Sequence, residues 1–179
     1  MNPTIKIYLQ FIETLADRAK HSPDIVFRNR LRGDILRYTS RIMNVTSVYL
    51  CQHNFEAKHS ILRGAFVLNT FDPVEAESEI GTTYYEPENS DWSRWLRDGY
   101  HTPRVLHTEN LSKDHPEYEE YGEFDMLSII FVGVYYQGDL WGYVETWDTR
   151  NHREYPRWEQ EVLEKVCQLI STTILTDTG

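Results

Sequence analysis

The apolar residues are densest between Met126 and Asp148, where two stretches rich in β-branched and aromatic residues flank a short polar segment. That segment, Gln137-Gly138-Asp139, contains the glycine that a tight hairpin turn favours, because glycine adopts positive φ at no steric cost. The pattern predicts two antiparallel strands joined by a two-residue turn. The rest of the chain is arranged around this hairpin.

The hairpin sorts its residues onto two faces, because successive side chains of a strand point in opposite directions. One predicted face carries Ile129, Phe131, Gly133, Tyr135, Leu140, Gly142 and Val144. The other carries Ser128, Ile130, Val132, Val134, Trp141, Tyr143, Glu145 and Trp147. Both sets are largely apolar, so we expect both faces to be covered. The glycines of the first set leave room for a helix to approach. The aromatic, hydroxyl and carboxylate groups of the second suit either a ligand pocket or an ordinary aromatic core.

Three amphipathic helices are predicted, two at the start of the chain and one at its end. Apolar residues at helical spacing indicate the first over residues 4–20 and the last from Pro156 onward. Ser22 and Pro23 are a typical N-cap and first residue of a helix, so the second helix is expected to begin there and to end near Met43.

Further strands are predicted between these helices, over residues 46–52, 59–68 and 104–107. The acidic stretch 69–89 is predicted to be a long loop, which is typical of a lid or a binding loop. A short helix follows it with Trp92 and Trp95 on one face, where they could roof a pocket or plug the core. Consecutive antiparallel strands with helices at both ends predict an α+β domain, one sheet with the terminal helices on one face.

Composition narrows the possible partners. The 179 residues carry a net charge of −10 and 40% hydrophobic residues, enough for one full core. The acidic balance argues against nucleic acid as a partner, since a phosphate-binding surface is basic. No apolar run is long enough for a membrane span and no signal peptide is recognisable, so we expect a cytoplasmic location without membrane association. Cys51 and Cys167 lie far apart and are expected to be buried thiols.

Three passages resemble GAF domains, a family of sensory domains related to PAS domains. They are DILRYTSRIMNVTSVYL, LRDGYHTPRVLHTENLSKDHPEY and SIIFVGVYYQGDLWGYVETWDTRNHREYPRWEQEVLEKVCQLIST. The resemblance covers about Arg32 to Leu175. It implies a six-stranded antiparallel sheet with the terminal helices on one face and a loop-covered pocket on the other. On this basis, residues 32–179 are expected to form the GAF-like domain and residues 1–31 an N-terminal helical extension.

The resemblance also implies a function. GAF domains bind cyclic nucleotides, bilins, haem or small metabolites, and they pair through their terminal helices. The chain is therefore expected to be a sensory or regulatory module that binds an unidentified small molecule and transmits a signal through its terminal helices. The glycine face is expected to meet those helices, and the other face to look into the pocket. The candidate pocket residues are Tyr49, Trp92, Trp95, His107, Ser128, Ile130, Val132, Tyr143 and Glu145.

A second function stays open, a ligand-free dimerisation or interaction domain with a filled pocket. A pocket occupied by Trp92, Trp95 and Tyr143 would favour this alternative, whereas a cavity with Glu145 and His107 pointing inward would favour ligand binding. In either case we expect a homodimer through residues 4–43 and the last helix, because symmetric pairing is the commonest association of like chains.

Signatures for particular ligands do not match. The residues Asn110, Lys113, Phe124 and Asp125 follow the order of the cyclic-nucleotide pattern of GAF domains, but their spacing is wrong and no acidic residue follows. Bilin-binding members need a cysteine in the pocket loops or helix, which Cys51 and Cys167 do not supply. The methionine sulfoxide reductase branch needs several cysteines. The cofactor, if any, stays unknown.

Other chemistry finds little support. His107, Asp114 and His115 could converge through their loop, but no histidine pair has the helical spacing of a metal site. The sequence has no phosphate-binding glycine loop, no HExxH and no GxSxG motif. We therefore expect no metal site and no enzymatic activity.

Overall fold

The structure, a computed structural model, describes residues 3–68, 79–86, 90–110, 113–114, 118–123 and 125–174. Within them, six strands form one antiparallel sheet in the order β3-β2-β1-β6-β5-β4. The strands are β1 (Ser47–Asn54), β2 (His59–Val67), β3 (Thr83–Tyr85), β4 (Arg104–His107), β5 (Ser128–Tyr136) and β6 (Asp139–Asp148). The predicted α+β class is confirmed. Strand β3 lies in a stretch predicted to be loop, of which residues 69–78 and 87–89 are outside the described residues.

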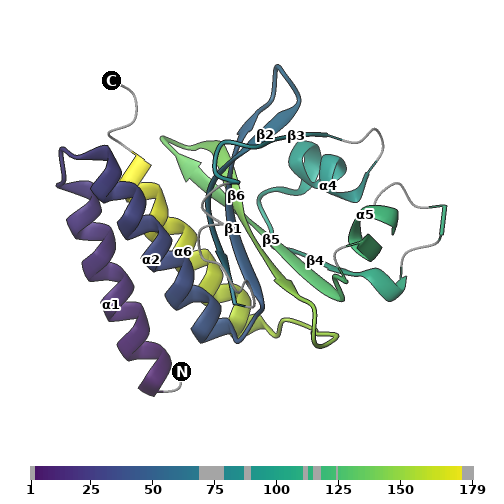
Figure 1. Ribbon diagram of the computed structural model, residues 1–179, viewed down its shortest axis with the longest axis horizontal. Coiled ribbons are helices and arrows are strands. Elements are labelled where there is room, and N and C mark those ends of the chain that lie inside the picture. Colours follow the sequence, from purple (N-terminus) through teal and green to yellow (C-terminus); the bar gives the residue numbers. More distant parts are fainter. Residues whose placement is uncertain are drawn as a thin grey trace.

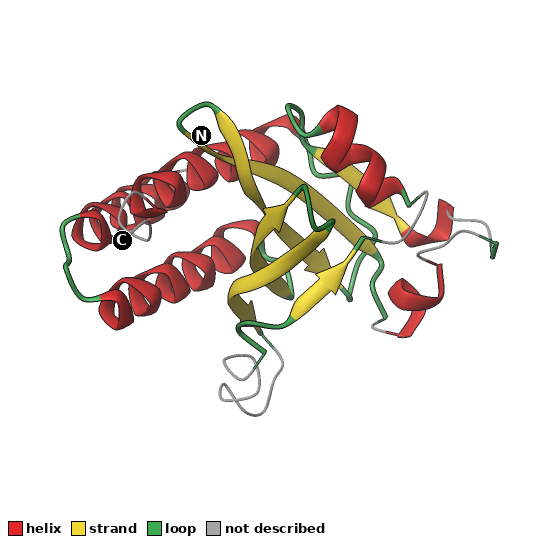
Figure 2. Cartoon of the chain, turned by 90° about the horizontal axis from the view of Figure 1, so that it is seen from above, coloured by secondary structure: helices red, strands yellow, loops and turns green. Residues whose placement is uncertain are grey.

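The long helices cover one face of the sheet and the short ones lie across the other (Figures 1 and 2). The long helices are α1 (Pro3–Lys20), α2 (Ile25–Met43) and α6 (Arg157–Ile174). The short ones are α4 (Asp91–Arg94), the π-helical turn η1 (Trp95–Gly99), the 3₁₀ turn η2 (Thr108–Asn110) and α5 (Tyr118–Glu123). Helices α2 and α6 pack on the sheet, and α1 packs on α2 and α6 as a further layer.

Helix α2 begins at its cap. The Asp24 carboxylate accepts hydrogen bonds from the backbone N–H groups of Val26 and Phe27. These bonds satisfy donors that would otherwise lack a partner at the helix start, so Asp24 is the N-cap and the prediction of Ser22 was two residues early. The helix ends at Asn44, whose left-handed φ of 50° closes the last turn.

The main core lies between the long helices and the sheet. Its fully buried members include Ile12 of α1, Ile35 of α2 and Leu163 of α6. From the sheet it takes Val48, Leu50, Ile130, Val132, Val134 and Val144. Burying these side chains is the main term that stabilises the fold, at about 25 cal/mol per Å² of apolar surface removed from water. Helix α1, whose apolar stripe contains Ile12, therefore buries that stripe on its own domain.

The central hairpin turns at Gln137-Gly138, where both residues have positive φ, 54° and 96°. The strands then run in register until the pair Val134–Gly142 meets the pair Tyr135–Leu140, which leaves Trp141 as an extra residue of β6. This β-bulge reverses the alternation of β6 relative to β5. The predicted two-residue turn is confirmed. The predicted faces are wrong, because they combine residues of β5 with residues of β6 that lie on the opposite side of the sheet beyond the bulge.

The bulge decides which residues share a face. On the face away from the long helices, Ile129, Phe131 and Gly133 of β5 pair with Trp147, Glu145 and Tyr143 of β6. On the helix-covered face, Ile130 and Val132 pair with Thr146 and Val144. The predicted glycine face does not meet the terminal helices as one surface: a Cβ on Gly133 would meet the Tyr100 carbonyl at 3.0 Å, and one on Gly142 would meet the Cys51 carbonyl of β1.

Candidate functional site

The outer face of the sheet, opposite the long helices, carries an aromatic cluster. The rings of Trp92 and Trp95 each lie 6.0 Å from that of Tyr143, and Trp95 lies 5.7 Å from Phe131. The Trp95 indole N–H donates to the Thr102 carbonyl at 2.9 Å. All four rings are at most 9% exposed. The short helix α4 and turn η1 thus place their tryptophans as a plug on β5 and β6, the arrangement that favours the filled-pocket alternative.

Beside this cluster, the outer face is only half-buried. Tyr49 of β1 pairs in register with Glu145 of β6, and its ring lies 4.5 Å from that of Trp147 at an interplanar angle of 47°. All three side chains are partly exposed. Burial raises the pKa of the Tyr49 hydroxyl, and the nearby Glu145 carboxylate raises it further. Two aromatic walls beside a carboxylate offer apolar contact together with a hydrogen-bond acceptor.

A chain of buried polar groups runs under the cluster. The Tyr143 hydroxyl is hydrogen-bonded to Ser60 and to the Cys51 thiol, and burial raises the pKa values of Tyr143 and Cys51 well above their usual range. The Ser60 hydroxyl lies 2.9 Å from Nδ1 of His53, and Nε2 of His53 lies 3.0 Å from the Glu86 carboxylate. The chain thus leads from the cluster to the β3 edge of the sheet.

The ionisation of this chain follows from its burial. Burial, together with the charge of the nearby His59, lowers the pKa of His53 to about 4. Burial also raises the pKa of Glu86. A neutral imidazole can accept a hydrogen bond from Ser60 at Nδ1, whereas Nε2 lies close to Glu86 without forming a hydrogen bond to any described residue. No role for His53, Ser60 or Glu86 was predicted from the sequence. The alternation of Cys51 and His53 on β1, with Ser60 opposite on β2, is the signal that could have revealed them.

Three predicted pocket residues, Ser128, Ile130 and Val132, lie on the face of the sheet that the long helices cover. Ile130 and Val132 are buried in the core between the sheet and the long helices. The prediction grouped them with Tyr143 and Glu145 because it assumed unbroken alternation around the hairpin, which the extra residue Trp141 interrupts. Tyr49, Trp92, Trp95, Tyr143 and Glu145 lie on or over the outer face, and their binding role stays a prediction.

His107 and Ser128 form a separate group at the end of β4 and β5. They pair in register, with the Ser128 hydroxyl 3.4 Å from Nδ1 of His107, and Ser128 lies on the same side of its strand as Ile130. Ser128 accepts a hydrogen bond from the Arg153 backbone at 2.7 Å, and Nε2 of His107 lies 3.9 Å from Glu154. These contacts hold the β6–α6 loop. His107 and Glu145 therefore do not point into one cavity.

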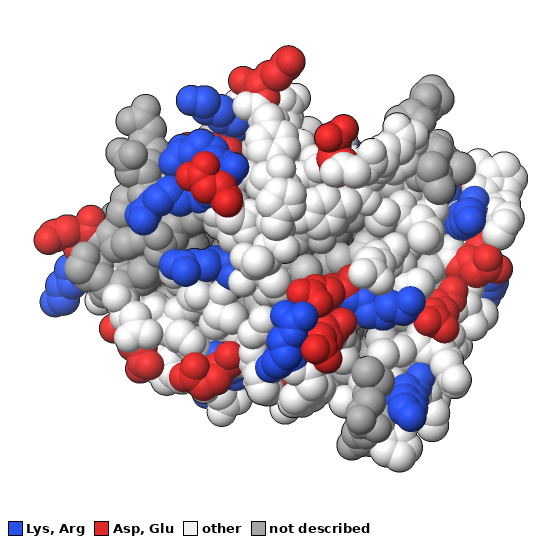
Figure 3. Space-filling view, turned by 180° about the vertical axis from the view of Figure 1, so that it is seen from behind, with Lys and Arg blue, Asp and Glu red and all other residues white. Residues whose placement is uncertain are grey.

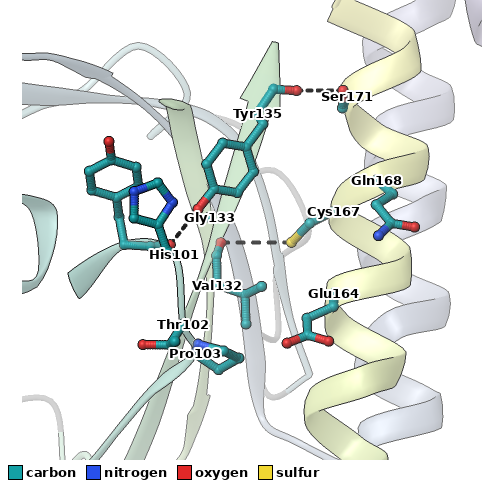
Figure 4. Close-up of a pocket in the computed structure, with 11 residues that line it drawn as sticks. His101, Thr102, Pro103, Val132, Gly133, Tyr135, Glu164, Cys167, Gln168 and Ser171 are labelled. Carbon is teal, nitrogen blue, oxygen red and sulfur yellow. Dashed lines mark hydrogen bonds between the residues drawn. The ribbon is translucent and has the colours of Figure 1, made fainter. Parts of the chain in front are cut away.

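A cavity of about 320 Å³ lies elsewhere, between β5, α6 and the segment before β4 (Figure 4). The walls from the strand side include Tyr100, His101, Val132, Gly133 and Tyr135. Helix α6 contributes Glu164, Cys167, Gln168 and Ser171. This cavity was not predicted from the sequence, because it depends on how far β4 extends along β5.

The charged side chains give no sign of a nucleic-acid surface on the face seen in Figure 3. There, Lys and Arg side chains are interspersed with Asp and Glu and form no continuous basic area. Among the described residues, no group of three His, Cys, Asp or Glu side chains could hold a metal ion. His115, a residue considered for such a site, is outside them. None of the described helices is both long and apolar enough to span a bilayer.

Comparison with known proteins identifies the fold. No protein-family model and no curated protein matches the sequence. Among solved structures, the phycoerythrobilin-bound GAF domain from a cyanobacterial phytochrome matches with a TM-score of 0.71 at 11% identity, over 98% of each chain. The phycocyanobilin-bound GAF domain from a cyanobacterial phytochrome gives 0.68 at 12% identity over 100% of each chain.

A further match comes from Thermosynechococcus elongatus. The blue-light absorbing form of its PixJ GAF-domain gives a TM-score of 0.66 at 7% identity, covering 87% of this chain and 90% of that one. This chain therefore has the GAF-domain fold, and the resemblance seen in its sequence is confirmed at the level of the fold.

Proposed function

We propose that this chain is a non-enzymatic regulatory module that binds a small molecule on the outer face of its sheet. Binding would shift the strands and thereby alter the packing of the long helices on the other face. The observation that carries the proposal is the unequal burial of that face. Trp92, Trp95 and Tyr143 close one part of it, whereas Tyr49, Glu145 and Trp147 leave the adjoining part half-buried. A site with two aromatic walls and one carboxylate suits a small ligand that carries an apolar ring and a hydrogen-bond donor.

The structure argues for a ligand smaller than the bilins of the structural neighbours. The aromatic cluster occupies the space that a larger group on this face would need. Both cysteines are buried: Cys51 is hydrogen-bonded to Tyr143, and the Cys167 thiol lies 3.7 Å from the Val132 carbonyl oxygen on the helix side. Neither thiol is placed for covalent attachment of a chromophore at the outer face.

A route to the helices runs through the strands themselves. Tyr49 of β1 is flanked by Val48 and Leu50, and Glu145 of β6 follows Val144. These three apolar neighbours point the other way and are fully buried against the long helices. A ligand that shifts β1 against β6 therefore changes the packing of α2 and α6, because tightly packed cores transmit small displacements.

The test is native mass spectrometry of gently purified protein, followed by denaturing analysis of any released molecule. A stoichiometric small molecule in the wild type that is lost in Glu145→Ala supports the proposal. The Glu164→Gln variant is the control, because Glu164 lines the separate cavity beside α6. A molecule retained by Glu145→Ala, or an empty wild-type protein that binds nothing from a metabolite extract, would contradict the outer-face site.

A second candidate function is a ligand-free homodimerisation or interaction module. The aromatic cluster favours it, since a filled outer face leaves the helical layer as the functional surface. That layer exposes an aromatic patch, which consists of Ile7, Tyr8, Phe11 and Tyr38. Ile7 is 64% and Phe11 43% exposed, so α1 has apolar area to bury against a second copy.

A further inference from the structure

The cavity beside α6 exists because β4 is shorter than its neighbour. Strand β4 pairs with β5 only from Arg104, opposite Phe131, to His107, opposite Ser128. Beyond Phe131, β5 continues to Tyr136 without β4 alongside. The cavity of about 320 Å³ lies along this stretch, and α6 forms its other wall (Figure 4). It is separate from the outer-face site, because it adjoins the edge strand and a long helix.

One side of α6 lines the cavity with polar groups. Glu164, Cys167, Gln168 and Ser171 follow each other at spacings of three, one and three residues, which places them on one side of a helix. Figure 4 shows Glu164, Cys167 and Ser171 on the side of α6 that faces the strand with Val132 and Tyr135. The polar groups thus sit on a rigid element, which is a favourable way to hold a binding site.

The hydroxyl and thiol donors of the walls are already in use. Ser171 donates to the Tyr135 carbonyl at 2.5 Å, and the Cys167 thiol lies 3.7 Å from the Val132 carbonyl. The Tyr135 hydroxyl donates to the Tyr100 carbonyl at 2.6 Å, and the Thr102 hydroxyl donates to the Gly99 carbonyl. A carbonyl oxygen has two lone pairs, and that of Gly99 uses both, because it accepts from the Thr102 hydroxyl and from the Thr102 backbone N–H. His101 and Gln168 bring N–H donors to the cavity, and the carbonyls of Val132 and Tyr135 bring acceptors.

The Glu164 carboxylate adds a negative charge to these acceptors. Arg157 lies 3.5 Å from it but is also 3.1 Å from Glu161, and its side chain is 66% exposed. Such an exposed pair contributes only about 0–1 kcal/mol, so a bound cation can replace Arg157 at Glu164 while Arg157 stays with Glu161. The rings of Tyr100 and Tyr135 at the same cavity provide faces for cation–π contact.

We propose that this cavity binds a small organic cation, a primary amine or a guanidinium group, with Glu164 as its counter-ion and the carbonyls of β5 as acceptors. Such a group donates hydrogen bonds to these carbonyls and to Glu164, whereas an anion would meet the like charge of Glu164. The cation belongs either to a free small molecule or to a Lys or Arg side chain of another protein. A bound cation contacts β5 and α6 together and so fixes α6 against the sheet edge.

The experiment titrates butylguanidinium into ¹⁵N-labelled protein and follows the amide signals of Gly133, Cys167 and Gln168. Pentanamide and pentanoate are the neutral and anionic controls of similar length. We expect saturable shifts at these amides with butylguanidinium, weakened by added salt, and none with the two controls. Equal shifts with pentanamide, or shifts confined to the outer-face residues Tyr49 and Glu145, would overturn the proposal.

Two variants make the test specific. Glu164→Gln is expected to raise the Kd for butylguanidinium at least tenfold. Glu13→Gln is the control, because it removes one half-exposed carboxylate of α1 that does not line the cavity and does not contact Arg157, and it should change the Kd less than twofold. Gln168→Phe, at an exposed helix position, should block the cavity without loss of the fold. An unchanged Kd in both Glu164→Gln and Gln168→Phe would overturn the site.

A blocked pentapeptide, Gly-Gly-Arg-Gly-Gly, distinguishes the two sources of the cation. Binding at least tenfold tighter than that of butylguanidinium would indicate a protein side chain as the natural partner. Weaker binding would indicate a free small molecule. Failure of both probes would overturn this site without touching the outer-face proposal, whose test depends on Glu145.

Discussion

The Nδ1 atom of His53 lies 2.9 Å from the Ser60 hydroxyl, and both side chains are buried at adjacent positions of β1 and β2. The opposite ring nitrogen lies 3.0 Å from Glu86. The order Ser–His–Glu resembles a catalytic triad, but Ser60 is fully buried and its hydroxyl also bonds to Tyr143. We therefore interpret the group as a structural network that ties the β3 edge to the aromatic cluster.

His53 should make the stability of the domain depend on pH. Its folded-state pKa of about 4 lies below the ordinary value of 6.5, so between these values the unfolded chain binds a proton that the folded chain does not. The free energy of unfolding should therefore fall as the pH drops from 6.5 towards 4, by about 1 kcal/mol per unit. Above pH 6.5 this contribution is constant.

Denaturant unfolding at pH 7, 6 and 5 measures this slope. Glu86 acts in the opposite direction because its pKa is raised, so the comparison belongs in a Glu86→Gln background. The Glu86→Gln protein should lose stability between pH 6.5 and 5, and adding His53→Gln should flatten the curve. Parallel curves for the two proteins would show that His53 does not titrate in this window.

A side chain at Gly142 of β6 would collide with the backbone of β1. A Cβ there would lie 2.0 Å from the Cys51 carbonyl oxygen, which only a backbone shift can relieve. We expect Gly142→Ala to lower the free energy of unfolding by at least about 2 kcal/mol, since overpacked sites cannot relax freely. Gly33→Ala is the matched control: its Cβ meets nothing within 4 Å, and alanine in helix α2 should stabilise by about 1 kcal/mol.

The two glycine variants are compared by thermal and denaturant unfolding. Equal effects of Gly142→Ala and Gly33→Ala would contradict the close approach of β1 and β6. The comparison also tests the register of the hairpin, because the β-bulge next to Gly142 sets which strand backbone it meets.

The sequence was sufficient for features that depend on local pattern. Apolar periodicity located the long helices, and Gly138 located the central turn. It was not sufficient to assign the strand residues to the two faces of the sheet. A single extra residue, Trp141, reverses the alternation of β6, and no local signal distinguishes it from its neighbours. Ile130 and Val132 were placed in the pocket for this reason, and Phe131 was left out.

The candidate sites also depend on tertiary packing that the local sequence pattern does not reveal. Trp92, Trp95 and Tyr143 were recognised as pocket or plug from their types alone, but which of the two applies depends on tertiary packing. The cavity beside α6 could not be predicted, since it arises because β4 begins only at Arg104, opposite Phe131, while β5 continues to Tyr136. The pairing of His53 with Glu86 joins residues from separate elements, and no spacing in the sequence encodes it.

Trp95 should be the main support of the outer face. Its indole contacts Phe131 and Tyr143 and donates to the Thr102 carbonyl while remaining 4% exposed. Trp95→Ala removes these contacts and leaves a void, so we expect a loss of about 3–5 kcal/mol. Near-ultraviolet circular dichroism and denaturant unfolding measure the change.

Trp158→Ala is the control for that substitution, because Trp158 on α6 is 45% exposed. It should cost less than about 1 kcal/mol, as surface substitutions usually do. If Trp95→Ala were no more destabilising than Trp158→Ala, the outer face would not be closed by the tryptophans, and a larger ligand than proposed would become the better interpretation.

The aromatic patch should control self-association. The ring of Phe11 meets that of Tyr38 edge-on at 4.8 Å, and the guanidinium groups of Arg37 and Arg41 lie 5.6 and 5.4 Å from the centre of the Tyr38 ring. A homodimer would cover Ile7 and Phe11 on both copies of α1. We expect Phe11→Glu to weaken dimerisation at least tenfold, because it places a carboxylate in an apolar contact.

Sedimentation equilibrium over a range of protein concentrations measures this association. Ile80→Glu is the control, since Ile80 is 46% exposed, close to the 43% of Phe11, but lies in the turn before β3, across the sheet from α1. The wild type and Ile80→Glu should share one dimer constant, and Phe11→Glu should be largely monomeric at the same concentration. A wild-type protein that stays monomeric at all concentrations would exclude the helical dimer and leave α1 as a cover for its own domain.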